Sequence, residues 1–543
     1  MSRTTRTTRN RWLAGGGGIL AAAAVLAVTA APAQAAPLPR GTTQVSVGPN
    51  GAAPDNLSTT QGISANGRYA LFTSRATNLV AQPATGGSDA YVRDLRTGRT
   101  ERVSLSDSGE AVAGWTDQAA ISGNGRYVAF ESNAEDVVPG MQVKGRTEVY
   151  VRDRQTGRTE LISGGLTVTD TDRYHYSYAP SISANGRYVA YVSSRTDLDP
   201  TVVDPEPETE PGTAPSLARP YTWKINVHLT DRWTHTTRLV TRDVHGKPGE
   251  STSFRPKISA DGRTIGFGSI SNLLPDEQAP GLAAATTAAA AAPADVDLTP
   301  SAAEASRQNV PQNAAQPTLA RPNAAPYYTY DVRSGKITAV SAGLDGQIGS
   351  ASFEATISPD GRHAVYTLAE PGGSTGGHRS HTVLYVRDLK KGTVTKVSGG
   401  LPGTSSVGSS DHGSITADNR WIYFESAADN LVAGPQHPGW DVYRQDLRTG
   451  RTERISTAPD GSFGNGSSRD PVVAASGRTV LFDSTSGNLV AGADGPAAEE
   501  NTQVFAKPAG RHQGLDAAQD DDGQDDDGQG DDQGDGQGEG WDD

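Results

Sequence analysis

The chain of 543 residues contains no cysteine, and only nine of its 48 basic residues are lysines. Without cysteine, the protein can form no disulfide bond and carry out no thiolate catalysis, redox chemistry or thiolate metal binding. The preference for arginine, together with abundant alanine and glycine, is typical of a GC-rich genome such as that of an actinobacterium. We therefore expect a fold that is stabilised by packing and hydrogen bonds alone.

An excess of positive charge is also missing, because the formal net charge is −14. Thirteen of the acids lie between Asp516 and Asp543, a stretch without a single base. Its glycine, glutamine and aspartate composition predicts that residues 511–543 form a disordered acidic tail. The tail lacks the spacing of an EF-hand or a calcium-binding β-roll. This charge balance argues against binding to nucleic acid.

Long hydrophobic runs are confined to the N-terminus. Four arginines precede an apolar stretch from Ile19 to Ala30, and Ala33-Gln34-Ala35 follows it. This order is typical of a secretory signal peptide, so we predict that residues 1–35 are removed by cleavage between Ala35 and Ala36. An uncleaved membrane anchor is the alternative, but the apolar core is short for a span. We expect the mature protein to be secreted or associated with the cell envelope, without a membrane span.

A unit that occurs seven times dominates the rest of the sequence. In the second copy, Ile121 leads through Asn124-Gly125 into the alternating run Tyr127 to Phe130, and a second strand pair follows from Val149 to Ser163. The first strands of the copies begin with an apolar residue, at Ile63, Ile121, Ile182, Ile258, Ile357, Ile415 and Val473. Alternating apolar residues around Asn-Gly predict hairpins, so each unit should be a four-stranded antiparallel sheet.

Two of the units, Ile258 to Arg263 and Ile357 to Arg362, have the form apolar-Ser-x-Asp-Gly-Arg before an aromatic strand. This pattern resembles the TolB-type, or WD40-like (PD40), repeat, and the resemblance extends from about residue 42 to 508. It implies a β-propeller, in which repeated sheets stack around an axis. Propellers of this kind serve as binding platforms, as gatekeeping domains of proteases and as polysaccharide lyases, so the resemblance implies a fold more firmly than an activity.

The two ends of the repeat region complement each other. The seventh unit has no fourth strand, whereas Thr43 to Val47 resembles one. We predict an all-β, seven-bladed β-propeller with four-stranded antiparallel blades over residues 36–510, closed by an N-terminal strand that completes the last blade. Insertions at about 199–220 and 276–326 join second and third strands, which places them on one face of the disc. On the other face, the arginine of each first turn is expected to pair with an aspartate of its own repeat.

Few motifs suggest chemistry. Gly372 to Gly376 has the letters of a serine-hydrolase elbow, but no strand or helix flanks it as that motif requires. His378 and His381 have the spacing of a metal pair without an evident third ligand. We therefore predict neither a catalytic residue, nor a bound metal, nor a cofactor.

One repeat position is more informative. Three residues before each first-strand start, the chain should reach the mouth of the central channel, and the residues there are Thr60, Gln118, Ala179, Arg255, Glu354, His412 and Asp470. Convergent polar groups are what a ligand site requires, so Gln118, Arg255, Glu354, His412 and Asp470 are the candidate binding residues. Polar residues that only line a water-filled channel are the alternative.

Two functions remain open. The first is a monomeric binding scaffold that recognises a protein, peptide or glycan ligand at the channel mouth; the α/β domain that precedes the propeller in TolB is missing, so a role in Tol-type translocation does not carry over. The second is a propeller enzyme, a lyase or hydrolase, that acts on polysaccharide. Bound metal would favour the second, since His412, Glu354 and Asp470 are the only set that could hold one.

Overall fold

The computed structural model describes residues 41–82, 85–139, 146–164, 176–195, 197–202, 224–275, 324–352, 354–370, 381–401, 404, 408–428, 430–434, 437, 439–492 and 501–509. The predicted signal peptide, the acidic tail and most of both insertions lie outside these residues and remain predictions. Within them the structure is almost entirely β, with thirty strands and one short 3-10 turn, Pro49–Gly51. The same residues include no apolar helix of membrane-spanning length.

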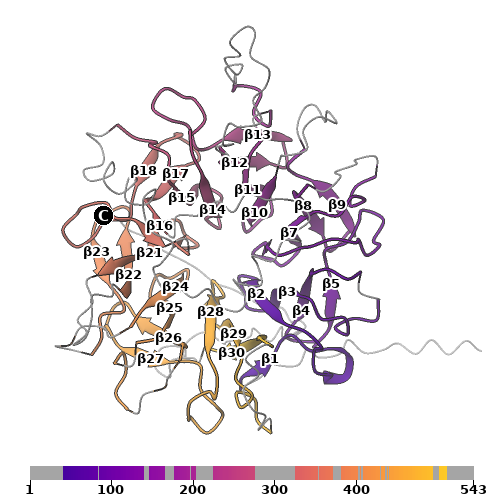
Figure 1. Ribbon diagram of the computed structural model, residues 1–543, viewed down its shortest axis with the longest axis vertical. Helices are drawn as coiled ribbons and strands as arrows, with labels where there is room; N and C mark the ends of the chain where they lie inside the picture. Colours follow the sequence, from indigo (N-terminus) through magenta and orange to yellow (C-terminus); the bar gives the residue numbers. More distant parts are fainter. Residues whose placement is uncertain are drawn as a thin grey trace, which may run out of the picture. The chain divides into compact units, whose positions relative to one another are not determined.

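Seven antiparallel sheets are arranged around an axis as the blades of a propeller, as the sequence predicted (Figure 1). Strands are given for each blade from the axis outwards. Blade one contains β2 (Ser58–Ile63), β3 (Tyr69–Ser74), β4 (Asp89–Asp94) and β5 (Thr100–Arg102). Blade two contains β6 (Ala119–Ile121), β7 (Tyr127–Ser132), β8 (Glu148–Asp153) and β9 (Arg158–Leu161). Blade three contains β10 (Ser177–Ile182), β11 (Tyr188–Ser193), β12 (Asn226–Asp231) and β13 (Thr236–Leu239). Blade four contains β14 (Ser253–Ile258), β15 (Thr264–Ser269), β17 (Tyr327–Asp331) and β18 (Ile337–Ala339). Blade six contains β24 (Ser410–Ile415), β25 (Trp421–Ser426), β26 (Asp441–Asp446) and β27 (Thr452–Arg454). Blade seven contains β28 (Ser468–Val473), β29 (Thr479–Ser484), β30 (Gln503–Pro508) and β1 (Thr43–Gln44).

Blade five departs from the regular unit. Its first strand is divided into β19 (Ala351–Ser352) and β20 (Thr356–Ile357), which both pair with β21 (His363–Glu370). The blade continues with β22 (His381–Asp388) and β23 (Val394–Lys396), and β16 (Ala324–Ala325) pairs with β19. Since β16 comes immediately before the third strand of blade four, it links two neighbouring blades.

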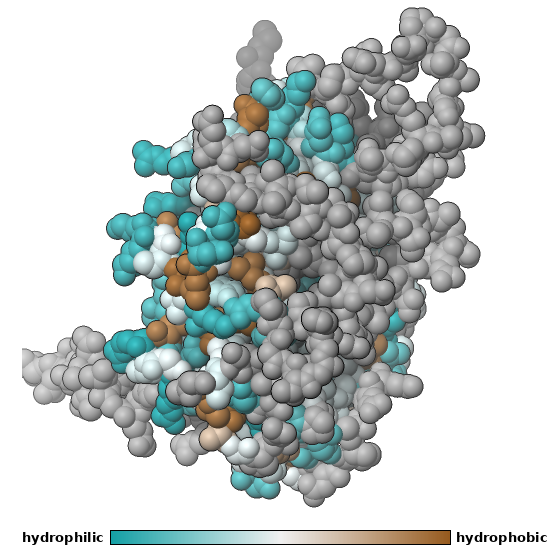
Figure 2. All heavy atoms as spheres, turned by 60° about the vertical axis from the view of Figure 1, so that its left-hand side comes forward, coloured by the Kyte–Doolittle hydropathy of each residue, from teal (hydrophilic) through white to brown (hydrophobic). Residues whose placement is uncertain are grey.

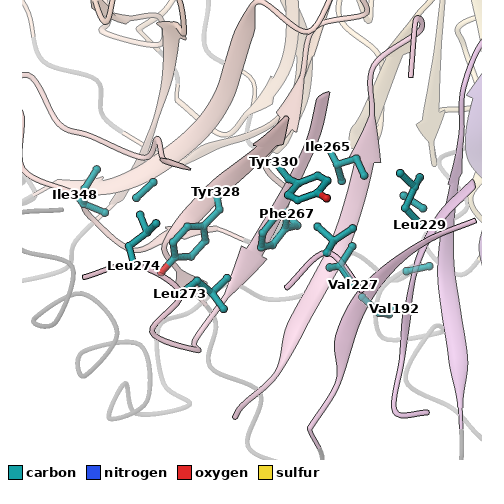
Figure 3. Close-up of a cluster of buried hydrophobic side chains, with 14 of the residues drawn as sticks. Val192, Val227, Leu229, Ile265, Phe267, Leu273, Leu274, Tyr328, Tyr330 and Ile348 are labelled. Atoms are coloured by element: carbon teal, nitrogen blue, oxygen red, sulfur yellow. The ribbon is translucent and has the colours of Figure 1, made fainter. Parts of the chain in front are cut away.

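Each blade carries the aromatic or histidine residue that the repeat placed on its third strand. In every blade this ring stacks on a ring of the second strand: Phe72–Tyr91, Phe130–Tyr150, Tyr191–His228, Phe267–Tyr328, Tyr366–Tyr385, Phe424–Tyr443 and Phe482–Phe505. Further apolar side chains fill the space between blades, and Figure 3 shows Val227, Phe267 and Tyr328 packed where blades three and four meet. The core is therefore a series of layers between sheets, which is how single sheets of this size bury both faces.

Antiparallel order gives the disc two distinct ends. The turns between first and second strands, and between third and fourth, form one end, which we call the turn face. The other connections form the opposite end, which we call the insertion face. On the turn face, main-chain hydrogen bonds join the first turns of successive blades: Ala65 to Gly123, Gly123 to Ala184, Ala184 to Ala260, Ala260 to Pro359, Ala417 to Ala475 and Ser476 to Ala65, donor first. The junction of blades five and six has no such bond because Pro359 has no N–H.

The arginines of the turn face serve the fold, as predicted. Five of them pair with the aspartate of their own blade: Arg68–Asp94, Arg126–Asp153, Arg187–Asp231, Arg362–Asp388 and Arg420–Asp446. In the second blade the distance from Arg126 Nη2 to Asp153 Oδ2 is 2.6 Å, and the guanidinium also lies over the ring of Tyr127. Arg126 and its bonds hold the pKa of Asp153 down, to about 2.

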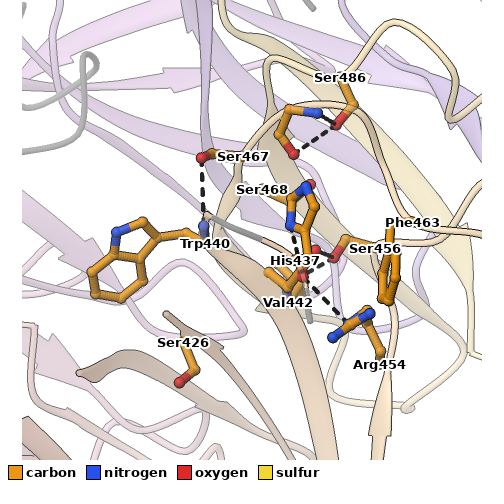
Figure 4. A network of polar contacts seen from close by, with 12 residues as sticks. Ser426, His437, Trp440, Val442, Arg454, Ser456, Phe463, Ser467, Ser468 and Ser486 are labelled. Atoms are coloured by element: carbon orange, nitrogen blue, oxygen red, sulfur yellow. Dashed lines mark hydrogen bonds and ion pairs between the residues drawn. The ribbon is translucent and has the colours of Figure 1, made fainter. Parts of the chain in front are cut away.

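A serine or threonine at the end of the fourth strand ties each blade together. Its hydroxyl accepts the N–H of a third-strand residue in all seven blades: Ser104, Ser163, Thr241, Ser341, Ser398, Ser456 and, in the last, Ser46. Figure 4 shows the arrangement in blade six, where Ser456 also donates to Asp441. Ser46 makes the same bond to Val504 from the other end of the chain, 3.0 Å long, and donates to Gln503.

The N-terminal strand therefore completes blade seven, as the sequence predicted. Beside Ser46, the N–H of Val45 donates to Val504 O over 2.7 Å, and the Val45 side chain is fully buried. We expect deletion of residues 42–47 to destabilise the whole propeller, since burial of Val45 alone contributes about 1.5 to 3 kcal/mol to a domain stability of typically about 5 to 15 kcal/mol. Thermal unfolding measures the effect. The control is Ser104→Ala, which removes the equivalent hydroxyl group from blade one, whose four strands are continuous in the chain. This variant should lower the melting temperature much less than the deletion does. An unchanged melting temperature after the deletion would contradict the closure.

Candidate functional site

The predicted site position has an unusual backbone. Four non-glycine residues there, Ala179, Arg255, His412 and Asp470, adopt left-handed φ angles of 45° to 54°. In each of these blades the pairing of first and second strand is interrupted at this point by a bulge. A left-handed conformation costs an L-residue roughly 1 to 2 kcal/mol, and such strain is concentrated at functional sites. Each of the four is the third residue of a six-residue innermost strand. The apolar residue that was expected to begin that strand, such as Ile258, is instead its last residue, so the expected strand start was wrong.

Four of the five candidate residues come together there. Arg255 of blade four forms an ion pair with Glu354 Oε1 of blade five. The other oxygen of Glu354 lies 3.3 Å from His412 Nε2 of blade six, and the same nitrogen lies 2.9 Å from Asp470 Oδ1 of blade seven. A continuous chain of ion pairs thus crosses four consecutive blades. We call Arg255, Glu354, His412 and Asp470, with Glu425 described below, the mouth cluster.

Gln118 is not part of this chain. Its carbonyl accepts the N–H of Glu131 over 3.1 Å within blade two. Of the motifs considered from sequence, Gly372 to Gly376 and His378 lie outside the described residues. His381 begins β22, where it is the register partner of Glu370, the last residue of β21.

Sequence reasoning missed a second set of residues, on the second strand of the blades. Glu131, Glu425 and Asp483 each precede the last residue of that strand and are at least nine-tenths buried. Each accepts the backbone N–H of the site residue of the next blade: Glu131 from Ala179, Glu425 from Asp470 and Asp483 from Thr60. The sequence did contain a signal for these buried acids. In six of the seven blades the second strand ends in a serine, and only in these three blades is the residue before that serine acidic.

Glu425 also completes the surroundings of His412. Its Oε1 lies 3.2 Å from His412 Nδ1, so both ring nitrogens face carboxylates. Burial alone lowers the pKa of the His412 imidazole, but the charges of Glu425 and Asp470 and the hydrogen bonds to both outweigh burial and raise that pKa well above 6.5.

The mouth cluster also contains a donor set for a metal. His412, Glu425 and Asp470 each offer one ligand atom, and these atoms lie within 4.8 Å of one another. A metal needs the lone pair of a neutral imidazole nitrogen, whereas both nitrogens of His412 are directed at carboxylates as donors. Metal binding would therefore require loss of a proton and displacement of one carboxylate.

A second polar cluster surrounds Asp441 on blade six (Figure 4). The Asp441 carboxylate lies 3.2 Å from His437 Nδ1 and 3.3 Å from Arg454 Nε, and it accepts a hydrogen bond from the hydroxyl group of Ser456. Blade one has Asp89, Arg102 and Ser104 in the same arrangement. Since the arrangement recurs with the repeat, we assign it to the stability of the blades.

Comparison with known proteins finds only distant similarity. No protein-family model matches the sequence, and no curated protein is detectably similar to it. Similar solved structures include an oligogalacturonate lyase in complex with manganese (TM-score 0.46, 10% identity, 86% of this chain and 93% of that chain). They also include the β-propeller domain of the Trilobed protease from Pyrococcus furiosus (0.41, 12%, 85% and 95%) and a putative TolB from Agrobacterium tumefaciens (0.33, 13%, 76% and 95%).

Burial of Glu131 generates a prediction about pH. Burial raises the pKa of this carboxyl to about 8, against 4.5 in an exposed chain. Between about pH 4.5 and about pH 8 the carboxyl of Glu131 therefore keeps its proton in the folded protein and loses it in the unfolded chain. The contribution of Glu131 to the free energy of unfolding consequently decreases as the pH rises through this range. We expect Glu131→Gln, which keeps an acceptor for Ala179, to flatten the fall of the melting temperature over this range. The exposed Glu135→Gln is the control; identical pH profiles for wild type and Glu131→Gln would refute the assignment.

Proposed function

We propose that this protein is a secreted or envelope-associated binding protein that recognises a protein, peptide or glycan ligand with the mouth cluster on its insertion face. The observation that carries the proposal is the ion-pair chain from Arg255 through Glu354 and His412 to Asp470, with three of its four residues in a left-handed conformation. Ion pairs that remain partly exposed can exchange their partners for those of a ligand, and these side chains are 7% to 25% exposed.

Other parts of the described surface offer fewer features for recognition. Among the described residues, the large hydrophobic side chains that are exposed are Trp233, Val244 and Leu344, each on a different connection. In Figure 2, hydrophobic residues lie in small groups among hydrophilic ones on the side of β18 and β23. A polar ligand at the mouth therefore accords better with this surface than a broad apolar interface does.

The proposal is tested with a screen of neutral, acidic and basic glycans and peptides against the wild-type protein. We expect Glu354→Ala and Asp470→Ala to weaken binding of any ligand found by about tenfold or more, because each removes a charged hydrogen-bond acceptor. Glu160→Ala, which changes a carboxylate on the turn face, should leave binding unchanged. A ligand that is indifferent to both mouth variants and lost with Glu160→Ala would place the site on the other face.

An enzyme that acts on polysaccharide is the second candidate. The observation in its favour is the set of three ligand atoms from His412, Glu425 and Asp470. Elemental analysis of the purified protein distinguishes the two functions: stoichiometric metal that is lost in Asp470→Asn would favour the enzyme, whereas metal-free protein that binds its ligand would favour the binding protein.

A further inference from the structure

The charges of the mouth cluster identify a class of ligand, if the proposed function holds. Asp411 adjoins the cluster, because its Oδ1 accepts the N–H of His412 over 2.9 Å. Three carboxylates, Glu354, Glu425 and Asp470, face one guanidinium and one imidazole, and Asp411 adds a fourth carboxylate beside them. Even with His412 charged, negative charge is in excess. A local excess of negative charge attracts ligands of positive charge.

Two of these carboxylates are already arranged around a single cationic donor. Glu354 and Asp470 come from blades five and seven, yet both reach the same nitrogen of His412, at 3.3 Å and 2.9 Å. An ammonium group carries three donors and no acceptor, so it can bond to both carboxylates at once. Charge-assisted bonds of this kind are about twice as strong as neutral ones.

An aromatic residue, Phe254, stands next to the cluster in the sequence. Phe254 precedes Arg255 on β14 and lies flat across Gly268, where an added Cβ would come within 2.2 Å of the ring. Gly268 occupies the repeat position at which blades two, six and seven place Glu131, Glu425 and Asp483 against the site residue of the next blade. Phe254 itself lies one residue before Arg255 on the innermost strand of blade four. The face of an aromatic ring attracts an ammonium group.

We propose that the mouth cluster binds an ammonium group of the ligand, supplied by an amino sugar or by the amine of a peptide, between the carboxylates of Glu354 and Asp470. A polyanion would meet the excess of carboxylates and be repelled. An ammonium group, like a metal, would take over carboxylate oxygens that now contact His412, but unlike a metal it needs no lone pair from the imidazole.

Calorimetry on the full chain tests this with pairs of probes that differ only in the amine. One pair is a glucosamine oligosaccharide and its N-acetylated form; the other is a peptide with a free N-terminus and its acetylated form. We expect the amine-bearing member of at least one pair to bind, acetylation to weaken it by about tenfold or more, and the responding pair to identify the source of the amine. An acidic oligosaccharide such as oligogalacturonate should not bind.

Isosteric variants locate the amine. Glu354→Gln and Asp470→Asn should each weaken amine binding about tenfold, and asparagine tolerates the left-handed conformation of position 470, so the fold is kept. Glu160→Gln on the turn face is the matched control. Arg255→Gln removes a competing cation and should tighten amine binding, which a purely structural role would not produce.

Three results would overturn the inference: equal binding of acetylated and free probes, binding of Mn²⁺ or of the acidic oligosaccharide that Glu354→Gln abolishes, or no binding of any amine probe at millimolar concentration. The first two leave the mouth as a binding site and refute only the amine. Binding of a ligand that neither Glu354→Ala nor Asp470→Ala affects would refute the proposed function itself.

Discussion

Closure of the ring is the constraint on which the rest of this structure depends. The chain begins its last blade near residue 468 and completes it with residues 43 and 44, so blade seven exists only when the two ends of the repeat region meet. The mouth cluster depends on the same closure, because blade seven supplies Asp470 and because Asp483 of that blade holds Thr60 of blade one. Ring closure thus sets the separation of the innermost strands, and with it the distances within the ion-pair chain.

The two ends of the disc use the repeat differently. On the turn face, the serine, the Asn-Gly or Asp-Gly turn and the arginine recur in most blades, and their bonds stay within a blade or join one turn to the next. On the insertion face, the residue before the closing position of the second strand varies from blade to blade: Thr73, Glu131, Val192, Gly268, Thr367, Glu425 and Asp483. Repetition is required where identical contacts hold identical blades together. Where the residue at one repeat position differs from blade to blade, the seven structurally equivalent positions can together form a single asymmetric site.

Sequence was sufficient for most of the fold because the fold is periodic. Alternating residues and Asn-Gly turns give the strands, their recurrence gives seven blades, and the likeness of Thr43 to Val47 to a fourth strand gives the closure. The division of the first strand of blade five was not predicted, since Ala351 and Thr356 lie in a stretch with the ordinary spacing. For the site, the position of Arg255, Glu354, His412 and Asp470 followed from the repeat. The left-handed backbone of Arg255, His412 and Asp470 and the contribution of Glu425 did not, because both depend on how one blade packs against the next.

The energetics of the mouth argue that it is more than a device for stability. Ion pairs with buried members contribute little net stability, since the loss of hydration offsets their attraction. Left-handed backbone adds a cost of roughly 1 to 2 kcal/mol for each of Arg255, His412 and Asp470. Glycine would remove that cost, and apolar side chains would fill the space without desolvating charge. Glu425 offsets part of the strain by accepting the N–H of Asp470, and its other oxygen fixes His412. One buried carboxylate therefore both supports the strained backbone and orients the charged side chains, which is the preorganisation that a binding site for a charged group requires.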